Sequence, residues 1–77
     1  MTWKRIQILF ETHPERLQVA EFLLKNGFSI KDNRIYVNEV EVPALKIARA
    51  IGVDRPTVAE TIRAMELDRD IRTVFRS

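Results

Sequence analysis

The sequence contains no cysteine, which excludes disulfide bonds, thiolate metal sites and cysteine nucleophiles. It has two glycines, too few for a glycine-rich phosphate loop. Its one histidine, His13, stands beside a proline, and neither Ser29 nor Ser77 lies in a nucleophile motif with it. We therefore expect no catalytic residue, no metal site and no cofactor, and we do not expect an enzyme.

Long apolar runs are also missing. No stretch approaches the length of a membrane span, and the first residues lack the apolar core of a signal peptide. We therefore expect no membrane partner and a cytoplasmic location. The 77 residues fit one small domain, and a hydrophobic content of 45% is enough for a compact core without disulfides.

Neither sign of charge dominates the chain. It carries 13 basic and 11 acidic residues, for a net charge of +2. Residues 43–77 hold seven of the basic and five of the acidic residues, so the excess lies in this half, while residues 1–42 balance. This asymmetry favours a phosphate-facing surface in the C-terminal half but is too small to establish one by itself.

The first 27 residues predict two helices. Apolar residues at helical spacing span residues 2–12. Pro14 is typical of the first turn of a helix, where its missing N–H costs nothing, and this second helix is expected to run to about Asn26. Gly27 then provides the left-handed residue that ends it.

Residues 28–42 predict a small antiparallel sheet, because apolar and polar residues alternate there. Asp32–Asn33 and Asn38–Glu39 are expected to form two-residue turns, which need residues that tolerate positive φ. The result is a three-stranded meander, which needs a helix packed on its apolar face to be stable. That face is expected to contain five residues: Ile30, Ile35, Val37, Val40 and Val42.

The segment 44–65 is the most informative part of the chain, because it has the pattern of two short helices joined by a tight turn, the layout of a helix-turn-helix. Ala48 is the small residue where the two helices would cross, and Gly52 supplies the positive φ that ends the first helix. Asp54 is a good N-cap for the second helix. The apolar seam between them is expected to consist of five residues: Ile47, Ile51, Val53, Val58 and Ile62.

A last short helix is expected from about Asp68 to Phe75, and the mixed charges of residues 68–72 indicate a solvated face with local ion pairs. The predicted fold class is therefore α+β and mainly helical. A helix-turn-helix trihelical core would carry a small three-stranded antiparallel meander inserted before the motif. Residues 1–77 would form this single domain.

The second helix of the motif is expected to be presented to DNA. At about 100° per residue, Val58, Ile62 and Met65 define its buried side. The opposite side is expected to carry Arg55 at its N-terminal flank, followed by Pro56, Thr57, Glu60, Arg63 and Ala64. The N-terminal half of such a helix enters the major groove. With the preceding helix it provides six candidate DNA-binding residues: Lys46, Arg49, Arg55, Thr57, Glu60 and Arg63.

Most of these candidates have a clear chemical role. Arg55 can donate two hydrogen bonds to a guanine edge. Thr57 can contact a base or a phosphate, and Arg63 can reach oxygens of the DNA backbone. Lys46 and Arg49, on the preceding helix, suit phosphate contacts that position the domain.

Glu60 has two interpretations. Its carboxylate can accept a hydrogen bond from a cytosine amino group, which would make it a specificity element. Alternatively, it forms a salt bridge with Arg63 or Arg55 on an ordinary solvated helix. The same choice holds for the whole motif. It is either a sequence-specific DNA-binding domain with double-stranded DNA as its partner, or a protein–protein interaction or dimerisation module on the same scaffold.

Three motifs extend this interpretation: W-K-x-I at 3–6 with Phe10, V-A-x-x-L-L-x-x-G-F at 19–28, and I-A-R-x-I-G-V-D-R at 47–55. On these motifs the chain resembles the N-terminal helix-turn-helix domain of archaeal predicted regulators of amino-acid metabolism, which carry a ligand-binding ACT domain behind it. The resemblance covers essentially all 77 residues. Where that family has glycines in the second strand turn, this chain has Asn38–Glu39.

The resemblance implies a transcriptional regulator of amino-acid metabolism whose affinity for DNA depends on an amino acid. We expect the 77 residues to be the N-terminal module of a longer regulator. The amino-acid effector would act only through a C-terminal domain that is absent from them. Because ACT domains commonly dimerise, the resemblance also implies a homodimer of the full-length protein.

Overall fold

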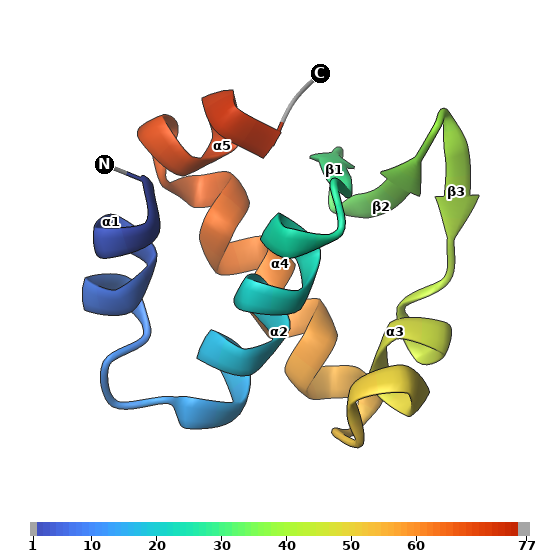
Figure 1. Ribbon diagram of the computed structural model, residues 1–77, viewed down its shortest axis with the longest axis horizontal. Helices are drawn as coiled ribbons and strands as arrows, with labels where there is room; N and C mark the ends of the chain where they lie inside the picture. Colours follow the sequence, from blue (N-terminus) through green and yellow to red (C-terminus); the bar gives the residue numbers. More distant parts are fainter. Residues whose placement is uncertain (1, 76–77) are drawn as a thin grey trace.

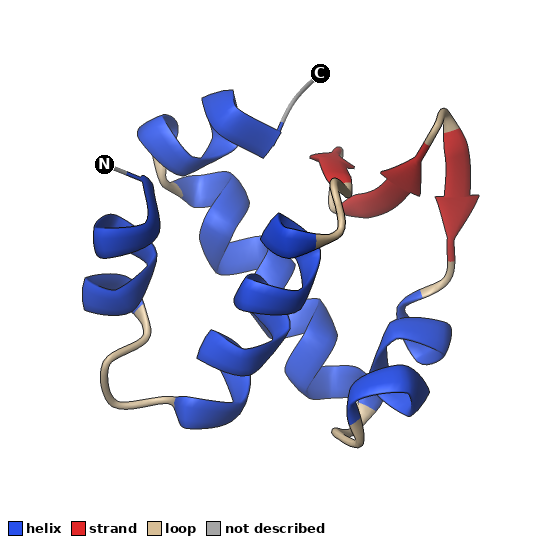
Figure 2. Cartoon of the chain, viewed as in Figure 1, coloured by secondary structure: helices blue, strands red, loops and turns tan. Residues whose placement is uncertain are grey.

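The computed structural model describes residues 2–75. This part of the chain is α+β and mainly helical, as predicted, with five helices and one three-stranded antiparallel sheet (Figures 1 and 2). In chain order the elements are α1 (Thr2–Leu9), α2 (Pro14–Lys25), β1 (Ser29–Lys31), β2 (Arg34–Val37), β3 (Val40–Val42), α3 (Ala44–Ile51), α4 (Arg55–Leu67) and α5 (Arg69–Phe75).

α1 is shorter than the predicted helix over residues 2–12, because it ends at Leu9. A turn follows, in which the backbone N–H of His13 donates to the carbonyl oxygen of Phe10 at 2.9 Å. The residue before a proline is disfavoured in the helical region, and His13, which precedes Pro14, accordingly has a non-helical backbone, with a φ of −132° and a ψ of 79°. α2 then starts at that proline, as predicted.

The predicted left-handed residues before α3 are confirmed. Gly27 follows α2 with a φ of 69°. Each predicted two-residue turn joins a pair of antiparallel strands. The four residues of the two turns all have positive φ: Asp32 at 53°, Asn33 at 61°, Asn38 at 50° and Glu39 at 66°. Both turns therefore have the left-handed backbone that a tight hairpin requires.

The sheet has an apolar face, of which only a part belongs to the core. Ile30 pairs with Ile35, and Ile35 pairs with Val42, so these side chains form a row on one face. Because β1 packs against α4 and α5, Ile30 and Ile35 are buried. Val37 pairs with Val40 nearer the second turn, where Val40 is 63% exposed. The predicted apolar face is confirmed, but its outer end faces solvent.

α4 lies at the centre of the fold. α2 and α3 pack against α4 and against each other, and α5 and β1 also contact it (Figure 1). One hydrophobic core joins all five helices. It includes Ile6 of α1, Leu23 of α2, Ile47 of α3, Met65 of α4 and Ile71 of α5.

The chain turns sharply between α3 and α4. Gly52 has a φ of 87°, and the backbone N–H groups of Gly52 and Val53 both donate to the carbonyl oxygen of Ala48, at 2.8 and 3.0 Å. This left-handed ending was predicted, and it makes α3 and α4 two separate helices. Within the predicted seam, three side chains are buried and two are half-buried: Ile47, Val58 and Ile62, then Ile51 and Val53.

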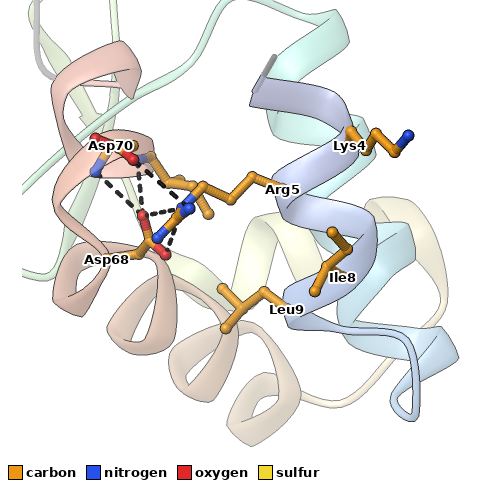
Figure 3. Close-up of a pocket in the computed structure, with 7 residues that line it drawn as sticks. Lys4, Arg5, Ile8, Leu9, Asp68 and Asp70 are labelled. Carbon is orange, nitrogen blue, oxygen red and sulfur yellow. Dashed lines mark hydrogen bonds and ion pairs between the residues drawn. The ribbon is translucent and has the colours of Figure 1, made fainter.

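Arg5 of α1 is bound to the start of α5. Its Nε lies 2.9 Å from each carboxylate oxygen of Asp68, and its Nη1 lies 3.6 Å from Asp70 (Figure 3). The Asp68 carboxylate also accepts from the backbone N–H groups of Asp70 and Ile71, each at 3.1 Å. The solvated face predicted at residues 68–72 is confirmed for Arg69, Asp70 and Arg72, which are exposed. The predicted local ion pairs are wrong, because Asp68 and Asp70 pair with Arg5 of α1. The partner of Asp68 is 63 positions away, and the Asp68 side chain is only 14% exposed.

Candidate nucleic-acid interface

α4 begins with a hydrogen-bonded N-cap. Asp54 precedes the helix in an extended conformation, and its Oδ1 accepts from the hydroxyl of Thr57 and, at 3.0 Å, from the backbone N–H of Thr57. Both hydrogen bonds lower the pKa of Asp54 below its ordinary value, the one from the Thr57 hydroxyl more than the one from the Thr57 backbone. The predicted N-cap is therefore confirmed, and it holds the first turn of α4 in place.

One side of α4 is buried in the domain. Val58, Ile62 and Met65 lie there, as predicted. Thr61 is also completely buried, although the sequence reasoning missed it, and its hydroxyl donates to the carbonyl oxygen of Thr57 at 2.7 Å. Its position three residues after Val58 was the available signal, because residues i, i+3, i+4 and i+7 share one helix face.

The other side of α4 faces solvent. Four of the residues predicted there are exposed: Arg55, Pro56, Glu60 and Arg63. Ala59 is exposed between them and was missed by the sequence reasoning. Ala64, which was expected on this side, is half-buried and packs against the core. The solvent-facing side is therefore centred nearer to Ala59 than predicted.

Lys46 and Arg49 provide two further exposed cations on α3, although their neighbours Ile47 and Ala48 are buried. Together with two arginines of α4 they form a set that we name the α3–α4 cations: Lys46, Arg49, Arg55 and Arg63. Within residues 2–75, the ion pairs that form involve other side chains, so each of these four charges is free of a carboxylate partner there. Their charge is available to an external anion.

The two remaining candidates differ from each other. Glu60 is exposed and makes no ion pair with another described residue, so its carboxylate can accept hydrogen bonds from a ligand. Thr57 is half-buried, and its hydroxyl proton is donated to Asp54. A phosphate oxygen only accepts hydrogen bonds, so Thr57 can donate to a phosphate only by giving up its contact with Asp54.

Over residues 2–75, we find no group of three or more histidine or carboxylate side chains placed to hold a metal ion. No helix in that range has both the length and the apolar character needed to cross a membrane. No protein-family model matches the chain, and it matches no curated protein and no solved structure. The resemblance to archaeal regulators of amino-acid metabolism therefore stays a prediction.

Proposed function

We propose that this chain is a sequence-specific DNA-binding domain of a transcriptional regulator. The observation that carries the proposal is the exposure of the α3–α4 cations, none of which is paired with a carboxylate in residues 2–75. In this proposal α2, α3 and α4 form a helix-turn-helix trihelical core. α4 is then the helix that enters the major groove.

The exposed side of α4 suits that role in size and in chemistry. The major groove of B-DNA is about 12 Å wide and admits one α-helix. Arg55 would donate to a guanine edge, and Glu60 would accept from a cytosine amino group. Arg63, about two turns after Arg55, would contact the DNA backbone together with Lys46 and Arg49 of α3.

The resemblance supplies the regulatory part of the proposal. A regulator of amino-acid metabolism would act in the cytoplasm, where its DNA is. It would bind its amino-acid effector through a C-terminal domain, which would also join two copies into a homodimer. The domain described by residues 2–75 would contribute the contact with double-stranded DNA.

A second candidate function is a protein–protein interaction or dimerisation module on the same scaffold. It is favoured by two large apolar side chains that are exposed on the same pair of helices. Leu45 of α3 is 42% exposed, and Leu67 at the end of α4 is 81% exposed. A partner protein would cover such side chains, and its affinity would depend little on salt.

Titration of the domain with labelled duplexes of several sequences, at salt concentrations of about 50 and about 200 mM, distinguishes the two functions. Three phosphate contacts, by Lys46, Arg49 and Arg63, predict that affinity falls by about 40-fold between these conditions, because about 0.9 counterion is released per contact. Absence of binding, or binding that ignores salt, would contradict a DNA-binding function. Equal affinity for every duplex would contradict its sequence specificity.

A further inference from the structure

Three exposed residues of α4, Arg55, Ala59 and Arg63, are spaced four positions apart. Residues at this spacing are neighbours on a helix surface, so the three form one ridge. The ridge has a single methyl group at its centre and a guanidinium group at each end. We propose that Ala59 packs against the C5-methyl group of a thymine and sets the base preference at the centre of the site, an inference that rests on the DNA-binding function proposed above.

The length of the ridge matches a short run of base pairs. Eight residues of α-helix rise about 12 Å, whereas successive base pairs are about 3.4 Å apart. The ridge from Arg55 to Arg63 therefore spans about three to four base pairs. Ala59 lies at its midpoint, so the base pair that faces it is in the middle of this run.

The side chain of Ala59 restricts which group it can recognise. Its methyl group neither donates nor accepts a hydrogen bond, so it cannot read the polar edges of the bases. The methyl of thymine is the apolar group that base pairs present in the major groove, and alanine is among the residues that contact it. Because the side chain is short, the helix backbone must approach the thymine methyl group closely.

The methyl group of Ala59 adds no buried surface to the core, since this residue is exposed. Glycine at this position lowers helix stability through its weak helix propensity, so a control with the same substitution is needed. Alanines of the core are different: Ala20 and Ala48 are buried, and Ala64 is half-buried against the core. Ala50 of α3 is a matched control, because it is also an exposed alanine within a helix but lies outside the ridge. A change at Ala59 can therefore be compared with the same change at Ala50.

The test starts from duplexes that the wild-type domain selects from a randomised library. In the selected site each thymine is replaced in turn by uracil, which removes only the C5-methyl group. Wild-type affinity should fall about fourfold when the central thymine is replaced. This is the size of the loss expected when one buried carbon group no longer contributes its hydrophobic stabilisation. The Ala59→Gly domain should not respond to this replacement, whereas the Ala50→Gly domain should respond as the wild type does.

A second variant keeps a good helix former at the same position. Ala59→Gln should change the selected central base from thymine to adenine, which glutamine recognises through two hydrogen bonds. If every uracil replacement affects the wild-type and Ala59→Gly domains equally, or if Ala59→Gln still selects thymine, this inference is wrong while DNA binding stands. If the wild-type domain enriches no duplex at all, the proposed function itself fails, and the role of Ala59 fails with it.

Discussion

The one arginine of α1 and the arginines of α3 and α4 have different surroundings. Arg5 of α1 lies between two carboxylates, with its Nε 2.9 Å from Asp68. The arginines of α3 and α4 have no such partner within residues 2–75: Arg49, Arg55 and Arg63. In the first region the charge connects two helices, and in the second it stays available to a ligand. Whether an arginine stabilises the fold or stays available to a ligand thus depends on the residues around it.

Asp68 is the centre of the contact between α1 and α5. Hydrogen bonding to Arg5 is the largest cause that lowers its pKa, and the backbone N–H groups of Ile71 and Asp70 lower it further, against the opposing effect of burial. The carboxylate therefore holds α1 and caps α5 at the same time. Loss of its charge should reduce stability, whereas loss of an α3–α4 cation should reduce binding.

The largest effect is expected when Arg55→Ala and Arg63→Ala are combined. Loss of a guanine contact costs about 1–3 kcal/mol and loss of a backbone contact adds to this, so the affinity for the preferred duplex should fall about 100-fold or more. Arg55→Ala alone should also relax the sequence preference. Fluorescence anisotropy at low salt measures both effects.

The same double variant should unfold at a temperature within about 2 °C of the wild type, because exposed residues without partners contribute little to stability. Thermal circular dichroism checks this expectation. An unchanged affinity would remove the difference between the two regions, since these arginines would then be as little involved in binding as Arg5.

The contact between Arg5 and Asp68 should be visible in acid. Because the pKa of Asp68 is lowered in the folded state, this carboxylate stabilises the fold above its unfolded pKa of about 3.9 and loses that contribution as pH falls through the folded value. Asp68→Asn should therefore lower the unfolding midpoint at about pH 6 by about 4–8 °C and weaken the loss of stability at lower pH. The variant should still lose some stability in acid, because the pKa of Asp54 is also lowered in the folded state.

Asp70→Asn is the matched control for this experiment. The Asp70 side chain is 71% exposed and lies 3.6 Å from Arg5, so its ion pair should contribute little. Thermal unfolding at several pH values compares the two variants, and duplex affinity should be unchanged in both. Equal losses of stability in the two variants would show that Asp68 contributes no more to stability than Asp70 does.

A smaller effect is expected from Lys46→Ala. Phosphate contacts carry no sequence information, so this variant should bind all duplexes more weakly to the same degree. The slope of affinity against salt should decrease by about one unit. Lys4, an exposed lysine on α1 beside Arg5, provides the control, and Lys4→Ala should leave the slope unchanged. A changed base preference in Lys46→Ala would contradict a phosphate contact.

The smallest effect should come from a position outside both regions. Glu39 adopts a φ of 66° in the turn between β2 and β3, a conformation that costs less for glycine. Glu39→Gly should raise the free energy of unfolding by about 1 kcal/mol, as measured by urea denaturation, and leave duplex affinity unchanged. A less stable variant would show that the turn gains more from the Glu39 side chain than it loses in strain.

Many structural features were predictable because they depend on a few adjacent residues. Gly52 marks the corner between α3 and α4, since only glycine adopts positive φ at no cost. Asp32–Asn33 marks a hairpin in the same way, and Asp54 marks a helix start because its side chain bonds to the backbone three positions later. Five of the six candidate DNA-binding residues were correctly expected to be exposed, and binding by them stays a prediction.

The prediction of the α4 surface was less complete. Helical spacing identified its buried side, but it did not distinguish Ala59, which is exposed, from Ala64, which is half-buried. The width of a buried side depends on which elements cover the helix, and α4 is covered by α2, α3, α5 and β1. Likewise, Thr57 was assigned to DNA because its hydroxyl bond to Asp54 was not anticipated.

The order of helices and strands, the corner at Gly52 and the two hairpin turns were determined by the sequence itself, because backbone preferences act over a few residues. Only the tertiary structure decided which charges are used inside the domain. Asp68 and Arg5 meet although 63 positions separate them, whereas Glu60 lies within a helical turn of Arg63 and does not pair with it. Ion pairing follows distance in space, and that distance is set by how α1 and α5 pack, which no local pattern contains.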